Sequence, residues 1–132
     1  MERLKIIRAT FFAALIVGVL HVFAVIFSLY VFYGWFDIPM HFFGGFLAGL
    51  FAVWTVFYAK EGALEPRTLW KTILTAFLGS LLVGLIWEFF EYAYGLTGNA
   101  LGSYALDTIK DLIMDMLGGL TAGAYLVSNS RL

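Results

Sequence analysis

Residues Asp107 to Gly119 read DTIKDLIMDMLGG, and this stretch sets three carboxylates in a segment that is otherwise apolar. Asp107, Asp111 and Asp115 recur every four residues, so a helix would align them on one face within an arc of about 80°. Carboxylates aligned in this way repel one another and are costly to remove from water. Other parts of the chain must therefore supply the groups that face them.

The composition of the chain is that of an integral membrane protein. Of its 132 residues, 62% are hydrophobic and only 13% are charged, and the mean hydropathy of +0.91 is far above that of soluble domains. The net charge of −1 gives no reason to expect a nucleic-acid partner, and the absence of cysteine excludes disulfides and thiolate metal sites. A chain of this length has room for about four membrane spans.

Four apolar segments predict an all-α fold, a membrane-embedded four-helix bundle that forms a single domain over residues 1–132. The first segment is too long to be the apolar core of a signal peptide. Pro39 disfavours helical geometry at Ile38, so the second helix should begin there, with Asp37 or Ile38 as its N-cap. Asp107 or Thr108 should cap the fourth. The predicted spans are 9–33, 39–58, 68–94 and 107–126.

Small and polar residues recur at helical spacing on the first three spans. Such stripes usually mark the face with which a membrane helix packs against its neighbours. The predicted stripes are Thr10, Ala14, Gly18, His21 and Ser28 on the first span, His41, Gly44, Gly45, Ala48 and Ala52 on the second, and Ser80, Gly84, Glu88 and Glu91 on the third.

Basic residues are distributed unequally between the segments that join the spans. Seven of the eight Lys and Arg residues lie in the N-terminal head, in residues 59–71 or at Arg131, and none lies in residues 34–40 or 95–107. The positive-inside rule therefore predicts that both termini are cytoplasmic. The expected localisation is the inner cell membrane, which the chain crosses several times.

This topology brings acids from three spans to the outer leaflet. So many carboxylates cannot all stay ionised in a medium of low dielectric constant, so either several are protonated or bound cations neutralise them. Oxygen-rich sites with an imidazole suit Mg²⁺, Mn²⁺, Ca²⁺, Fe²⁺ or Zn²⁺, and the number of ligands suffices for two ions. The expected metal ligands are His41, Glu88, Glu91, Asp111 and Asp115, with Asp37 and Asp107 as outer ligands or as hydrogen-bond partners of the ligands.

Several of these polar residues also have simpler interpretations. Asp37 and Asp107 could only cap helices, Glu91 could be solvated near the interface, and Lys110 could pair or extend toward water. His21 is better explained as a hydrogen-bonded packing residue than as a ligand. The deeper acids are harder to dismiss, because ionisable groups inside a membrane are by default functional.

The spacing of these residues resembles that of a known family. The motifs are Asp37-x-x-x-His41-x-x-Gly44-Gly45, Trp87-Glu88-x-x-Glu91 and Asp107-Thr108-x-x-Asp111-x-x-x-Asp115-x-x-Gly118. In these motifs the chain is similar to the YjdF-like small bacterial inner-membrane proteins and, more loosely, to the VanZ-like group. The resemblance covers the second, third and fourth spans. It implies a multi-span membrane protein and brings no settled activity with it.

Three functions remain open at this point. The first is divalent-metal binding near the outer leaflet; if the protein is an enzyme, it would be a metal-dependent hydrolase or transferase acting on lipid headgroups or lipid-linked phosphates. The second is a proton- or cation-coupled transporter whose carboxylates are kept protonated by burial. The third is a structural or regulatory membrane subunit. Membrane lipid is the expected partner, and the glycine-rich faces permit a homodimer.

Overall fold

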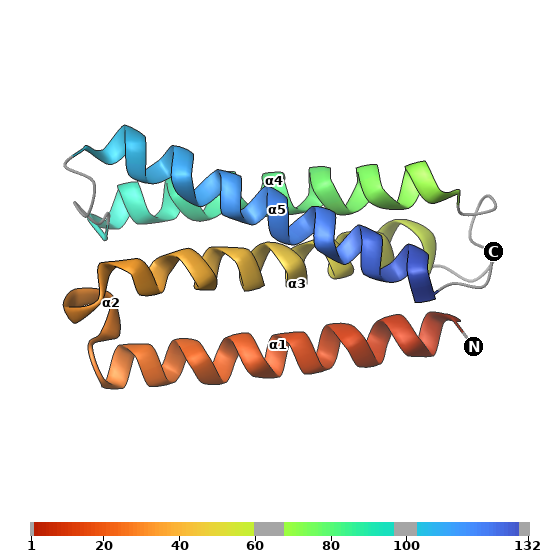
Figure 1. Ribbon diagram of the computed structural model, residues 1–132, viewed down its shortest axis with the longest axis horizontal. Helices are drawn as coiled ribbons and strands as arrows, with labels where there is room; N and C mark the ends of the chain where they lie inside the picture. The colour runs from red at the N-terminus through yellow and green to blue at the C-terminus, as the bar shows by residue number, and fades with distance from the viewer. Residues whose placement is uncertain (1, 60–67, 97–102, 130–132) are drawn as a thin grey trace.

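A computed structural model describes residues 2–59, 68–96 and 103–129, and these residues are almost entirely helical (Figure 1). The prediction of an all-α fold is confirmed. Parts of the two predicted polar loops, 60–67 and 97–102, and Arg131 lie outside the described residues. The elements are α1 (Glu2–Ile26), α2 (Leu29–Phe32), the 3₁₀-helix η1 (Gly34–Phe36), α3 (Asp37–Phe57), α4 (Leu69–Tyr94) and α5 (Tyr104–Asn129).

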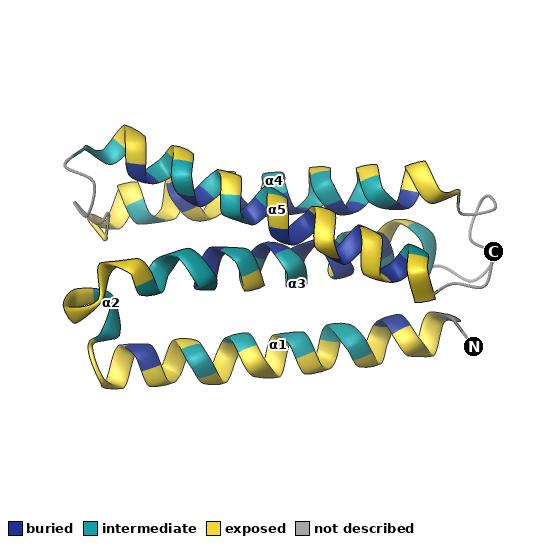
Figure 2. Ribbon diagram, viewed as in Figure 1, coloured by how far each residue is buried: buried dark blue, intermediate teal, exposed yellow. Residues whose placement is uncertain are grey.

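Helices α3, α4 and α5 pack against one another, and α1 packs mainly along α3. Figure 1 shows α1 at one edge of the molecule, with its first turns at the same end as the last turns of α5. The buried residues line the surfaces that α3, α4 and α5 turn toward each other, whereas most of α1 is exposed (Figure 2). The tightly packed part of the fold is therefore the group of three helices that carries the acids.

Three helical segments of the described chain are long and apolar enough to cross a membrane, namely Arg3–Ile26, Gly34–Phe57 and Leu69–Tyr94. Their outer surfaces expose many large Phe, Leu, Ile and Val side chains, as contact with lipid would require. Helix α5 is as long as α4, 26 residues each, but its first half contains four charged residues. The fourth predicted span therefore differs from the other three in composition and not in length.

The bounds of helix α1 differ at both ends from the predicted first span of residues 9–33. Helix α1 already includes the basic head, and it ends at Ile26 instead of continuing to residue 33. Ser28 adopts a left-handed conformation with φ of 53°, which an α-helix of L-residues does not accommodate. The chain therefore leaves α1 here, and the short α2 follows in its own direction.

The predicted N-cap of the second helix is also wrong. Asp37 is the first helical residue of α3, and Phe36 precedes it without a side-chain capping bond. Pro39 is tolerated because it lies in the first turn, where its missing N–H would have had no partner within the helix. This early start places the carboxylate of Asp37 one turn before His41 on the same face.

Helix α5 begins three residues before the predicted cap. The hydroxyl of Ser103 accepts a hydrogen bond from the N–H of Leu106 at 3.3 Å, which is the capping role that the sequence pattern assigned to Asp107 or Thr108. Asp107 instead lies inside the helix and is buried. All three aspartates of the four-residue repeat are thus inward-facing helical residues, as the spacing predicts.

The small-residue stripes are correct for α4, largely correct for α3 and wrong for α1. In α4 the buried residues recur every four positions and end at Ser80, Gly84 and Glu88. On α1 the predicted stripe is mostly exposed, and the fully buried residues are Ile6 and Ala24. Because α1 packs mainly along α3, its buried face is narrow, and its fully buried residues are apolar.

Glycine allows α3 and α5 to approach each other to backbone contact. A Cβ built on Gly45 would overlap the main chain of Asp115, with 2.6 Å to its Cα. A Cβ on Gly118 would lie 2.6 Å from the N–H nitrogen of Phe46. From the α4 side, a Cβ on Gly84 would lie 3.0 Å from Cγ of Asp115. These glycines hold the three helices close around Asp115.

Replacing Gly45 with alanine should therefore destabilise the protein by about 1–3 kcal/mol, because the new methyl group overlaps backbone that cannot move aside locally. Gly44 is the matched control, since a Cβ there meets nothing within 4 Å. Thermal unfolding of both variants in detergent measures the difference. A Gly44→Ala variant that is destabilised as strongly as Gly45→Ala would contradict this packing.

Candidate metal centre

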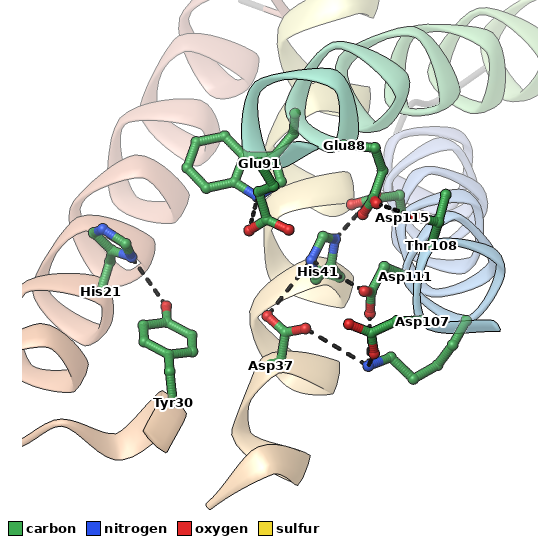
Figure 3. A network of polar contacts seen from close by, with 12 residues as sticks. His21, Tyr30, Asp37, His41, Glu88, Glu91, Asp107, Thr108, Asp111 and Asp115 are labelled. Carbon is green, nitrogen blue, oxygen red and sulfur yellow. Dashed lines mark hydrogen bonds and ion pairs between the residues drawn. The ribbon is translucent and has the colours of Figure 1, made fainter. Parts of the chain in front are cut away.

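His41 lies at the centre of a cluster of carboxylates contributed by α3, α4 and α5 (Figure 3). Only 6% of the residue is exposed. Its Nδ1 lies 3.2 Å from Oδ2 of Asp115, and its Nε2 lies 3.5 Å from Oδ1 of Asp37 and 3.9 Å from Oδ2 of Asp111. The imidazole therefore has one close carboxylate on one nitrogen and two more distant carboxylates on the other.

The two sides of the imidazole differ in chemistry. The contact between Nδ1 and Asp115 is a hydrogen bond, and a proton on Nδ1 satisfies it. The lone pair of Nε2 would then point toward Asp37 and Asp111, at distances too long for good hydrogen bonds. Two carboxylates around a lone pair repel it, and a cation between these groups removes the repulsion.

Glu88 enters the cluster from α4 and is 4% exposed. Its Oε2 accepts a hydrogen bond of 2.6 Å from the hydroxyl of Thr108. Its Oε1 is buried and has no hydrogen-bond partner among the described residues. A buried acceptor left without a partner costs about 1–3 kcal/mol, and more when it is charged. This oxygen fits a metal ligand, because a bound cation would satisfy it.

Glu91 lies one turn further along α4 and is only partly buried. The indole N–H of Trp87 donates a hydrogen bond of 2.8 Å to its Oε1. This bond orients the carboxylate and leaves its other oxygen available.

Lys110 is the ammonium group that faces the same acids. Its Nζ lies 2.7 Å from Oδ1 of Asp107, 3.0 Å from Oδ1 of Asp111 and 3.6 Å from Oδ2 of Asp37. Asp107 is thereby paired with Lys110. The sequence predicts that Lys110 pairs or extends toward water, but it does not predict contacts with three carboxylates.

Two overlapping groups of side chains could hold a metal ion. One is Asp37, His41 and Asp111, and the other is His41, Glu88 and Glu91; within each group one potential ligand atom from every residue lies within 4.8 Å of the others. Atoms bound to one ion at about 2.0–2.6 Å lie within about 5 Å of each other, so both groups fit this geometry. Among the described residues, neither Asp107 nor Asp115 belongs to such a group.

His21 lies apart from this cluster, on the exposed side of α1. Its Nδ1 is 2.9 Å from the hydroxyl of Tyr30, with which it shares a hydrogen bond (Figure 3).

A family model described as a predicted membrane protein (DUF2238) matches residues 1–131, almost the whole chain. The chain is a DUF2238 protein. The match confirms the resemblance to the YjdF-like small membrane proteins and establishes the chain as a predicted membrane protein. No curated protein and no solved structure matches the chain significantly.

Two side chains that orient the acids of this DUF2238 protein are absent from the predicted site. Trp87 could have been found, because it lies four residues before Glu91 and such pairs meet on a helix. Thr108 could not, because its bond to Glu88 joins two helices whose relative register no single-helix pattern reveals.

Replacing Thr108 with valine should destabilise this DUF2238 protein by about 1–3 kcal/mol, because the carboxylate of Glu88 then loses the hydrogen bond from the Thr108 hydroxyl while staying buried. Thr121→Val is the matched control on the same helix. Thr121 is exposed, and its hydroxyl donates a hydrogen bond to the carbonyl of Leu117 in the same helix instead of to a buried carboxylate. Thermal unfolding in detergent compares the two. Equal melting temperatures for both variants would show that the Thr108 bond is unimportant.

Proposed function

We propose that this DUF2238 protein binds a divalent metal ion inside the membrane, at His41 and the carboxylates around it. The observation that carries the proposal is that His41 belongs to two groups of potential metal ligands. In each group the ligand atoms all lie within 4.8 Å of one another. The buried Oε1 of Glu88, which has no partner in the described part of the chain, supports it independently. Buried carboxylates in a medium of low dielectric constant are stabilised by a bound cation.

In this proposal His41 ligates the ion through Nε2, together with Glu88, Glu91, Asp37 and Asp111. Asp115 has a different role from the one expected from the sequence, because it accepts the Nδ1–H bond and so holds the imidazole in the required orientation. Asp37 correspondingly becomes a ligand. Oxygen donors with one imidazole suit Mn²⁺, Zn²⁺ or Fe²⁺ and are compatible with Mg²⁺ or Ca²⁺.

The proposed placement in the inner membrane has α5 as a fourth span and both termini in the cytoplasm. Charge supports it, because Arg3, Lys5 and Arg8 lie at the start of α1 and the acidic cluster lies at the opposite end of the helices. The metal centre is then near the outer leaflet. A metal ion at that depth would polarise a phosphoryl or carbonyl oxygen, so lipid headgroups or lipid-linked phosphates are the proposed substrates if the protein is an enzyme.

A proton- or cation-coupled transporter is less well supported. Beyond Asp115, the buried residues of α3, α4 and α5 in the described part of the chain are Gly, Ala, Leu and Val, with Ser80 and Thr72 as the buried polar side chains of α4. Both hydroxyls already donate to carbonyl groups of their own helix. A conduction path needs polar groups that are free to exchange partners, and these two are engaged.

The simplest test compares the metal content of the wild type with that of variants at the two histidines, His41 inside the cluster and His21 outside it. Protein purified after incubation with Mn²⁺ or Zn²⁺ should contain metal in the wild type and in His21→Gln, and should lose it in His41→Gln, Glu88→Gln and Asp111→Asn. Inductively coupled plasma mass spectrometry measures it. Wild-type protein that retains no metal would refute the proposed function, and equal loss from His21→Gln would show that the effect is not local.

The role of Asp115 is tested by metal affinity. Asp115→Ala should weaken binding by about 10–100-fold, as expected for a residue that orients a ligand. Asp115→Asn should recover part of this loss, because its amide oxygen can accept the same bond from Nδ1–H. Metal titration by calorimetry measures both. If both variants bind equally weakly, Asp115 is itself a ligand.

A further inference from the structure

The carboxylates of Asp37 and Asp111 each face the imidazole of His41 with one oxygen and the ammonium group of Lys110 with the other. Oδ1 of Asp37 lies 3.5 Å from His41 Nε2, and its Oδ2 lies 3.6 Å from Lys110 Nζ. Oδ2 of Asp111 lies 3.9 Å from His41 Nε2, and its Oδ1 lies 3.0 Å from Lys110 Nζ. Both carboxylates therefore bridge the imidazole of His41 and the ammonium group of Lys110.

Bridging carboxylates of this kind are typical of sites that hold two cations close together. In two-metal sites the ions lie about 3.5–4 Å apart, and shared carboxylates keep them there. Here the second position is filled by the amine of Lys110, which also contacts Asp107 at 2.7 Å. In the described part of the chain, the carboxylates near the ring nitrogens of His41 are those of Asp37, Asp111 and Asp115, so Asp107 belongs to the Lys110 side of the cluster.

We infer that Lys110 is a tethered cation that occupies the second position of a two-cation site and limits this protein to one metal ion. This inference rests on the proposed function, because it assigns the number of ions at the same site. The metal is confined to the side of His41, Glu88 and Glu91. Lys110 places one positive charge among Asp107, Asp111 and Asp37, in the position that a second ion would otherwise take.

The single ion decides which chemistry is open to the site. A pair of metal ions stabilises the attacking and leaving oxygens of a phosphoryl transfer together. With Lys110 in the second position, one metal ion and one ammonium group face a bound anion instead. Lys110 is therefore a specificity-determining residue. Replacing it should change mainly the number of bound ions and have less effect on how tightly each ion binds.

The test uses full-length protein in detergent, loaded with Mn²⁺ and freed of excess metal. Wild type should retain about one Mn²⁺ per chain, with the electron paramagnetic resonance spectrum of an isolated ion. Lys110→Met removes the charge at nearly constant length and should retain about two ions, with a spectrum broadened by spin coupling. Lys110→Arg keeps the charge and should retain about one. Arg3→Met, at the exposed start of α1, controls for the loss of a positive charge elsewhere.

Two ions in the wild type, or a single ion in folded Lys110→Met, would overturn the inference. If Lys110→Met does not fold, the wild-type and Lys110→Arg measurements decide, since coupled ions in either contradict it and one isolated ion in both supports it. Wild-type protein without metal would refute the proposed function itself, and this inference with it. Two ions in the wild type would leave the proposed function standing and refute only the role of Lys110.

Discussion

The backbone contact between α3 and α5 is the constraint on which the rest of the structure depends. Gly45 lies against the main chain of Asp115, and Gly118 lies against that of Phe46. Helices this close place Asp115 within 3.2 Å of Nδ1 of His41. A larger residue at either glycine would separate the helices, and the imidazole would lose the carboxylate that orients it.

The second constraint on the structure is the negative charge of the cluster, which nearby cations or protons must compensate. Six carboxylates surround one imidazole and one ammonium group, namely Asp37, Glu88, Glu91, Asp107, Asp111 and Asp115. In a membrane such a cluster is stable only if protons or cations compensate it. Lys110 partly compensates the acids that it contacts, and in the proposed function a metal ion compensates those around Nε2 of His41. The cluster thus has a His41 side and a Lys110 side. Asp37 and Asp111 lie between the two, because each turns one oxygen toward His41 and the other toward Lys110.

Periodicity within single helices predicted much of this arrangement. The four-residue repeat of Asp107, Asp111 and Asp115 and the stripe that ends at Glu88 correctly identified the inward faces of α5 and α4. The all-α class followed from composition. These features depend only on spacing along one helix, which a sequence displays directly.

Features that depend on how the helices pack could not be predicted in the same way. The exchange of roles proposed for Asp37 and Asp115, and the bond from Thr108 to Glu88, require the register between helices. The end of α1 depends on one left-handed residue, Ser28, which has no strong sequence signal. The predicted packing face of α1 was wrong, because its small residues suggested close packing on that face, whereas α1 packs mainly along α3 through a narrow apolar face.

The central claim is that a metal ion is held by one imidazole and several carboxylates within the membrane. X-ray absorption spectroscopy of the Zn²⁺-loaded protein tests it most directly. The account predicts a shell of nitrogen and oxygen atoms at about 2.0–2.2 Å, with the scattering of one imidazole that His41→Gln removes and His21→Gln keeps. A spectrum of hydrated Zn²⁺ without imidazole, unchanged by His41→Gln, would contradict it.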